Sequence, residues 1–140
     1  MSSTASRDQL EAKKRNNYAM IEKDNTGKYL LTFTTNATIR RLPIPRYGTA
    51  KSGKEWSMGS VLVEAYEEDE SASAQLYLIT WDSLMIEQLE RLGVGKNVVV
   101  TFHIECSAYY DNYRTNLVLD SIEGKNENEN FLYGINKKGE

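Results

Sequence analysis

The most restrictive feature of this sequence is a single helical pattern that lies between segments favouring strands. Residues 82–93 carry apolar side chains at helical spacing, on Leu84, Ile86, Leu89 and Leu92. Asp82 or Ser83 can cap the N-terminus of this helix, and Gly93 can end it. The segments on either side are rich in β-branched and aromatic residues. The chain therefore predicts a β-structure that contains one helix.

Five strands are expected around this helix, three before it and two after it. They cover residues 30–44, 56–66, 74–81, 97–107 and 113–122. The alternation slips at Arg40-Arg41, which predicts a bulge, and Pro43 and Pro45 place the end of the first segment at an edge or outside the sheet. Three strands, a helix and a two-strand hairpin form the order of the OB-fold barrel. An SH3-like barrel usually lacks this helix. The predicted fold is therefore an all-β, five-stranded OB-fold barrel with one helix between strands 3 and 4.

Residues 97–107, the fourth expected strand, alternate regularly between two sheet faces. The face expected to point inward carries Val98, Val100, Phe102, Ile104 and Cys106. Cys106 is therefore interpreted as a small core residue, whereas His103 lies on the outward face. Because exposed strand edges are usually covered, we expect a homo-oligomer, and the outward Val99 and Val118 could form the contact.

The barrel is expected to occupy residues 28–123, with a segment of different character at each end. Residues 1–27 form an N-terminal extension, either a helix from Asp8 to Met20 or an unstructured arm. Residues 124–140 form a flexible, Asn/Glu-rich tail, whose Phe131-Leu132-Tyr133 cluster resembles a short docking motif. No stretch approaches the roughly 20 apolar residues of a membrane span, and no apolar signal segment follows Met1. These features favour a cytoplasmic location.

Little in the sequence favours an enzyme. His103 is the only histidine, and the sequence contains no zinc motif, no phosphate loop and no nucleophilic-serine motif. The acidic run at residues 67–70 is interpreted as a turn of solvated charge, because a calcium loop alternates its ligands and needs a glycine. We therefore expect no catalysis, no metal and no cofactor.

The chain has a net charge of −3 but contains one strongly basic segment. Residues 28–63 have a net charge of +5, because Glu55 alone opposes Lys28, Arg40, Arg41, Arg46, Lys51 and Lys54. Residues 64–81 carry five carboxylates and no basic group. A polyanion responds to the local field, so the basic segment could supply phosphate contacts. The alternative is a solvated basic strand beside a solvated acidic loop.

Aromatic residues are interleaved with these charges. The aromatic residues that a barrel would present near its loops and on its third strand are Tyr47, Trp56, Tyr77, Trp81, Tyr109, Tyr110 and Tyr113. Arg114 directly follows Tyr113. A basic groove with aromatic faces is what proteins use to bind single-stranded nucleic acid. Phe33 and Phe102 are expected in the core instead, whereas Trp56 and Trp81 suit either place.

The order of these motifs resembles that of bacterial and phage single-stranded DNA-binding proteins (SSBs) and of small SSB-like bacterial domains. The resemblance covers residues 38–123 and rests on Pro45-Arg46-Tyr47, Lys51-Ser52-Gly53-Lys54-Glu55-Trp56, Tyr77-Leu78-Ile79-Thr80-Trp81, residues 89–98 and residues 110–117. It implies an OB-fold that coats single-stranded DNA in replication, recombination or repair, with Trp56 and Trp81 as stacking positions. Residues 137–140 read Lys-Lys-Gly-Glu in place of the family's acidic tip, so the resemblance leaves the recruitment of SSB partner enzymes open.

Two functions follow from these patterns. The first is binding of single-stranded DNA in a bacterial cell or phage-infected host. The sequence patterns do not distinguish single-stranded DNA from RNA as the ligand. The second is an OB-fold interaction module in a replication or recombination complex. The candidate nucleic-acid-binding residues are Arg40, Arg41, Arg46, Tyr47, Lys51, Lys54, Trp56, Tyr77, Trp81, Tyr109, Tyr110, Tyr113 and Arg114.

Overall fold

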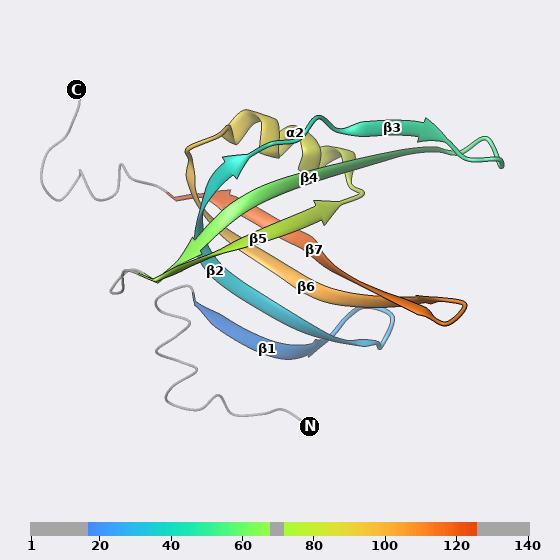
Figure 1. Cartoon of the computed structure of the whole chain (residues 1–140), viewed down its shortest axis with the longest axis horizontal. Coiled ribbons are helices and arrows are strands. Elements are labelled where there is room, and N and C mark those ends of the chain that lie inside the picture. The colour runs from blue at the N-terminus through green and yellow to red at the C-terminus, as the bar shows by residue number, and fades with distance from the viewer. Residues whose placement is uncertain (1–16, 68–71, 126–140) are drawn as a thin grey trace, which may run out of the picture.

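In the computed structural model, the described residues are 17–67 and 72–125. They form seven strands and one helix (Figure 1), namely β1 (Tyr18–Lys23), β2 (Tyr29–Arg41), β3 (Arg46–Thr49), β4 (Glu55–Tyr66), β5 (Ser73–Thr80), α2 (Ser83–Leu92), β6 (Asn97–Tyr109) and β7 (Asn112–Gly124). The sheet order is β1-β2-β6-β7-β5-β4-β3, and an additional pairing of β2 with β4 closes it. Within the two described ranges, no helix is long and apolar enough to cross a bilayer.

The barrel itself consists of β2, β4, β5, β6 and β7, and α2 lies between β5 and β6 in the chain. β2 pairs antiparallel with β6 on one side and with β4 on the other. A parallel pairing of Ile79 with Val118 joins β5 to β7. This topology confirms the predicted OB-fold barrel with one helix between its third and fourth strands. β1 and β3 are short additions that pair with β2 and β4 respectively.

The first barrel strand bends at the predicted place. The register of β2 against β4 shifts between Ile39 and Arg41, which confirms the bulge expected at Arg40-Arg41. Residues 42–45 then leave the sheet, because prolines at positions 43 and 45 have no N–H to donate to a neighbouring strand. The chain re-enters the sheet as β3 and so reaches one end of the barrel.

Part of the N-terminal extension is a strand, so the prediction of a helix or an unstructured arm is wrong for residues 18–23. These residues pair antiparallel with residues 29–34 of β2. The Asp24 carboxylate fixes the turn between them by accepting hydrogen bonds from the backbone N–H groups of Thr26 and Lys28. Cross-strand pairing outweighs a weak local helical preference.

The two ends of the chain lie outside the described residues. They comprise residues 1–16 and residues 126–140, and the latter include the Phe131-Leu132-Tyr133 cluster. The expectations about a helix before Asn17 and about a docking tail therefore stay predictions. The same holds for the acidic run, of which residues 68–70 are outside the description.

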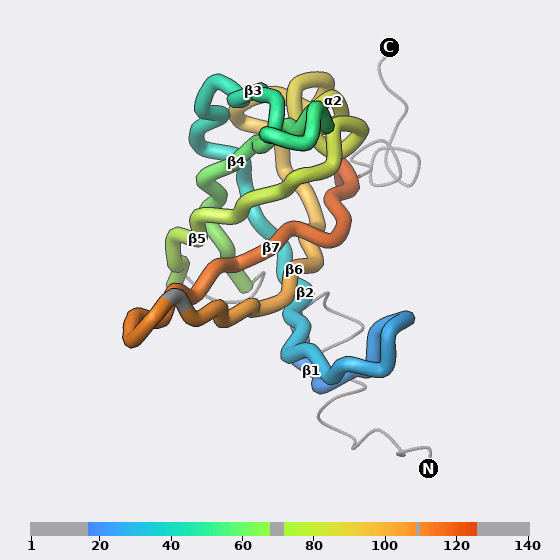
Figure 2. The backbone as a smooth tube through the Cα atoms, turned by 90° about the vertical axis from the view of Figure 1, so that its right-hand side faces the viewer, coloured from blue at the N-terminus to red at the C-terminus, as the bar shows by residue number. Residues whose placement is uncertain are grey.

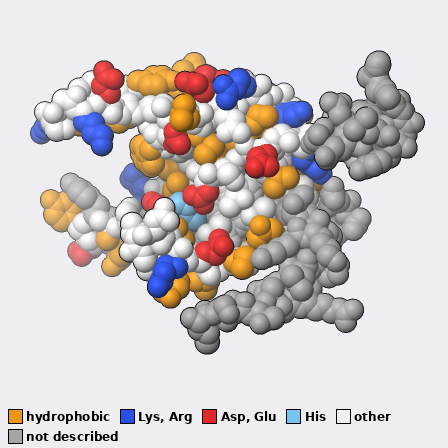
Figure 3. All heavy atoms as spheres, turned by 180° about the vertical axis from the view of Figure 1, so that it is seen from behind, with side chains coloured by type: hydrophobic (Ala, Val, Ile, Leu, Met, Phe, Trp, Pro, Cys, Tyr) orange, Lys and Arg blue, Asp and Glu red, His pale blue; other side chains and the backbone are white. Residues whose placement is uncertain are grey.

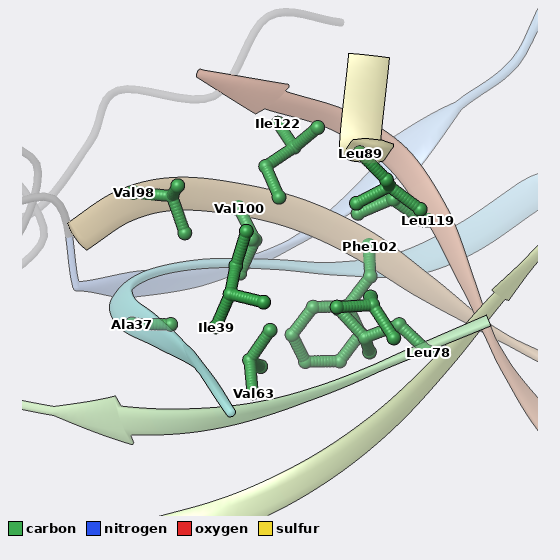
Figure 4. Close-up of a cluster of buried hydrophobic side chains, with 11 residues drawn as sticks. Ala37, Ile39, Val63, Leu78, Leu89, Val98, Val100, Phe102, Leu119 and Ile122 are labelled. Carbon is green, nitrogen blue, oxygen red and sulfur yellow. The ribbon is translucent and has the colours of Figure 1, made fainter. Parts of the chain in front are cut away.

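A continuous apolar core fills the barrel beneath α2 (Figure 4). Its buried members are Ala37, Ile39, Val61, Val63, Leu78, Leu89, Val98, Val100, Phe102, Leu119 and Ile122. Phe33 packs against this cluster and stacks on Phe102 with ring centroids 5.3 Å apart, which confirms the core placement of both rings. Gly59 allows α2 to approach β4, because a Cβ there would lie 2.6 Å from Cγ1 of Ile86. Each large buried side chain contributes about 1.5–3 kcal/mol, so the core holds α2 firmly on the barrel.

Beyond the core, β6 and β7 continue as a hairpin that projects from the barrel (Figure 2). Cys106 lies in this projecting part and is exposed, so its prediction as a core residue is wrong. Alternation along β6 assigns Cys106 to the inward face but cannot show where the barrel ends. Ile104, one step closer to the barrel on the same face, is half-buried.

Candidate nucleic-acid interface

The β3–β4 ribbon (residues 46–49 paired with residues 55–58) carries the first part of the candidate site. Tyr47 lies directly opposite Ser57, and Glu55 shares the face of these two residues because it is two positions away along β4. The Ser57 hydroxyl donates to the carbonyl oxygen of Trp81 over 3.4 Å. This contact brings the ribbon face toward the end of β5 and the start of α2.

The other face of the ribbon holds Trp56. Gly48 lies directly opposite Trp56, and a Cβ at Gly48 would overlap carbon atoms of the indole ring. The glycine therefore allows the indole to lie across the partner strand, a packing that pairs an aromatic ring with a strand glycine. Trp56 is still 42% exposed, so its ring remains accessible at the edge of the ribbon.

A groove runs between the ribbon and the N-terminus of α2. It has a volume of about 630 Å³ and is lined by Tyr47, Lys54, Glu55, Trp56, Ser57, Trp81, Asp82 and Ser83. Asp82 caps α2 by accepting a hydrogen bond from the Leu84 N–H at 2.9 Å. Trp81 follows the last residue of β5 and is 56% exposed, whereas Tyr47 is 67% exposed. Aromatic surfaces on both sides of an open groove can stack nucleobases.

The groove unites four of the predicted site residues, namely Tyr47, Lys54, Trp56 and Trp81. Two further predicted residues lie on the same ribbon. Lys51 is exposed in the turn between β3 and β4, and Arg46 is exposed on β3 with its Nη2 3.4 Å from the Met58 sulfur. The aromatic groove therefore has basic side chains on the ribbon that borders it.

Arg40 and Arg41 do not line the groove. The Arg40 Nε donates to the Glu64 carboxylate at 2.8 Å, and the Ser73 hydroxyl donates to the second oxygen of the same carboxylate at 2.6 Å. The hydrogen bond from Ser73, followed by the Arg40 contacts, lowers the pKa of Glu64 below its usual value. Arg41 is exposed and lies opposite Leu62. Glu64 therefore offsets part of the basic charge that the sequence assigns to this region.

The remaining predicted residues lie on β5 and on the β6–β7 hairpin. Tyr77 is exposed on β5, and Tyr113 and Arg114 are exposed on β7 opposite Ala108 and Ser107. They do not line the groove.

The tip of the same hairpin carries the last two predicted tyrosines. Tyr110 is 85% exposed in the turn, with a positive φ of 57°. Tyr109 is the last residue of β6, and its side chain lies outside the described part. Tyr110 and Tyr113 are thus a second exposed pair of aromatic residues, on the hairpin.

His103 is buried, which corrects the expectation of an outward surface residue. Its Nδ1 lies 2.9 Å from both carboxylate oxygens of Asp120, and its Nε2 lies 2.8 Å from Glu105 (the pale blue side chain beside acidic groups in Figure 3). Burial alone would lower the pKa of His103, but the hydrogen bonds to Glu105 and Asp120 outweigh it and raise the pKa. The register of β7 shifts beside Phe102, and Asp120 occupies the extra position. Sequence alternation did not show this bulge, so it did not show the cluster.

Among the described residues, no group of histidine, cysteine, aspartate and glutamate side chains could hold a metal ion. Sequence reasoning also missed the contributions of Glu55, Ser57 and Asp82 to the groove. The spacing of Gly48 and Trp56 on either side of the Lys51-Ser52-Gly53 turn was the signal that could have predicted this ribbon.

Comparison with known proteins gives matches among solved structures. No protein-family model matches the chain, and no curated protein does. The mitochondrial single-stranded DNA-binding protein of S. cerevisiae is 12% identical, with a TM-score of 0.49 over 67% of this chain and 94% of that chain. The SSB domain of a Synechococcus sp. protein is 16% identical, with a TM-score of 0.44 over 65% of this chain and 91% of that chain. A small single-stranded DNA-binding protein of Streptomyces coelicolor is 14% identical, with a TM-score of 0.40 over 69% of this chain and 94% of that chain.

Proposed function

We propose that this protein binds single-stranded DNA with little sequence preference and performs no covalent chemistry. The observation that carries this proposal is a groove lined by Tyr47, Trp56 and Trp81 together with Lys54, because all three aromatic side chains are exposed. Each base that stacks on such a ring contributes about 1–3 kcal/mol, and every base has a face that can stack. The site therefore binds strands of any sequence.

Phosphate contacts complete the site. Arg46, Lys51 and Lys54 lie on the ribbon that borders the groove, where their long side chains can follow a sugar–phosphate backbone. Phosphates look alike in every sequence, so these contacts add affinity without base preference. Coating and protecting single-stranded DNA during replication, recombination or repair would use both kinds of contact.

A second surface favours contact with protein. Ile21, Leu31 and Ile104 lie directly opposite one another on β1, β2 and β6, and Ile21 is 71% exposed. This apolar row supports the homo-oligomer expected from the sequence, or a module that docks on a replication or recombination protein. Val99 and Val118 are half-buried and offer less free surface. A monomer mass by light scattering at micromolar concentration would contradict self-association.

The test of DNA binding is a titration of the full chain with dT and rU oligomers at two salt concentrations. We expect quenching of tryptophan emission, because a stacked base lies against Trp56 or Trp81, and affinity that falls steeply with salt. Unchanged emission at saturating, independently measured binding would exclude these two rings as platforms. Absence of binding to every oligomer would favour the protein-docking function.

A further inference from the structure

Two carboxylates line the groove that the proposed function assigns to an anionic ligand. Glu55 lies on the ribbon face that also carries Ser57, and Asp82 directly follows Trp81. Within the described residues, Glu55 has no ion pair or side-chain hydrogen bond, and Asp82 uses only Oδ1, to cap α2. Carboxylate oxygens on both walls are therefore available to a ligand that enters the groove.

A carboxylate beside a stacked base distinguishes bases by their hydrogen-bond donors. Guanine presents two adjacent donors on its pairing edge, the ring N1–H and the exocyclic amino group, and these match the two oxygens of one carboxylate. Cytosine and adenine each present one amino group. Thymine presents one ring N–H that is flanked by two carbonyl oxygens. These oxygens are repelled by a carboxylate, because both groups are hydrogen-bond acceptors. Repulsion between carboxylates and phosphates is the same for every sequence and creates no base preference.

We propose that Glu55 and Asp82 read the base held between Tyr47 and Trp81, and that this position favours guanine over thymine. The inference rests on the proposed function and refines it at one nucleotide, while stacking and phosphate contacts elsewhere stay tolerant of sequence. The groove is open and both carboxylates are exposed, so water competes for the same donors. The expected preference is therefore about fivefold, the low end of what one paired contact to a base achieves.

The experiment compares three labelled oligomers of one length, by fluorescence anisotropy with the full chain. One contains thymine only, the second alternates thymine with guanine, and the third alternates thymine with hypoxanthine, which is guanine without its amino group. We expect the guanine oligomer to bind about fivefold more tightly than the thymine oligomer, with the hypoxanthine oligomer between them.

The decisive variant is the double substitution Glu55→Gln and Asp82→Asn. Asparagine caps helices about as well as aspartate, so α2 is retained. Because the new amides can donate to thymine carbonyl oxygens, the guanine-to-thymine affinity ratio should fall to about one. Glu87→Gln is the matched control, because Glu87 is an exposed carboxylate of α2 that does not line the groove. This control should keep the wild-type ratio.

The outcomes separate the inference from the proposed function. Equal affinity of the wild-type chain for all three oligomers overturns base reading but leaves DNA binding intact. A double variant that keeps the wild-type ratio overturns the role of these two carboxylates. If none of the oligomers binds, the proposed function fails, and the inference fails with it.

Discussion

Two ribbons project from this barrel, and they differ in what holds their aromatic side chains. The β3–β4 ribbon is tied to the barrel end, because Ser57 contacts the Trp81 carbonyl group and Trp56 packs over Gly48. The β6–β7 hairpin reaches past the core and leaves Tyr110 and Tyr113 strongly exposed. The first ribbon forms one wall of a groove lined by three aromatic residues, whereas Tyr110 and Tyr113 line no part of that groove.

This difference shows why exposed aromatic residues are not equivalent as binding sites. A side chain fixed by neighbouring groups loses less conformational freedom when a ligand arrives, so more of its contact energy appears as affinity. The ring of Tyr113, which is 76% exposed on the hairpin, must be ordered during binding. We therefore expect the β3–β4 groove to dominate affinity and the hairpin to contribute a smaller share.

The largest expected effect is the loss of a stacking ring from the groove. Trp81→Ala should weaken dT binding by about tenfold, within the range of about 1–3 kcal/mol for one stacked base. Tyr113→Ala is the matched hairpin variant, and its affinity should stay within about threefold of wild type. Both side chains are exposed, so neither substitution should impair folding. Anisotropy titrations measure both values, and equal losses would abolish the distinction between the groove and the hairpin.

The next effect concerns charge. Lys51→Ala combined with Lys54→Ala should reduce the slope of log affinity against log salt by about 1.4, because each phosphate of a single strand that a lysine neutralises adds about 0.7 to the slope. Arg114→Ala, on the hairpin, should change the slope by less than about 0.7. Titrations at several salt concentrations give the slopes. A larger change for Arg114→Ala than for the lysine pair would place the main phosphate path along the hairpin.

Much of the barrel could be predicted because its signals are local. The bulge at Arg40-Arg41, the departure of the chain at Pro43 and Pro45, and the capping of α2 by Asp82 all depend on neighbouring residues in the sequence. The groove was partly predictable for the same reason, since Tyr47, Lys54 and Trp56 flank one turn. The position of Trp81 against Ser57 depends on barrel closure, which no local pattern reveals.

The errors share a different cause. β1 was missed because residues 18–23 lack the alternation of apolar and polar side chains that marks a strand, although they form a hairpin with β2. Cys106 was misplaced because alternation does not report where a core ends. His103 was misplaced because a single extra residue, Asp120, shifts one strand beside it. Similarly, the ion pair of Arg40 with Glu64 joins the neighbouring strands β2 and β4, which are far apart in the sequence, and offsets charge that the sequence counts as free.

The smallest expected effect tests what anchors the base of the β6–β7 hairpin. His103 joins Glu105 on β6 to Asp120 on β7, and both ring nitrogens can donate only when the imidazole is protonated. The folded-state pKa is raised above the unfolded value, so this contact stabilises the protein fully below the unfolded pKa of about 6.5. The stabilisation is lost as pH rises through the folded pKa.

His103→Gln should therefore remove a pH-dependent part of the unfolding free energy on the order of 1 kcal/mol. Urea unfolding of the wild type and the variant at about pH 5.5 and about pH 9 measures this part of the free energy. Subtracting the two unfolding free energies at each pH cancels the contributions of the other titrating groups. The stability gap should be larger at the lower pH. A gap independent of pH would mean that folding leaves the pKa of His103 unchanged, so that its contacts with Glu105 and Asp120 add no charge-dependent anchor to the hairpin.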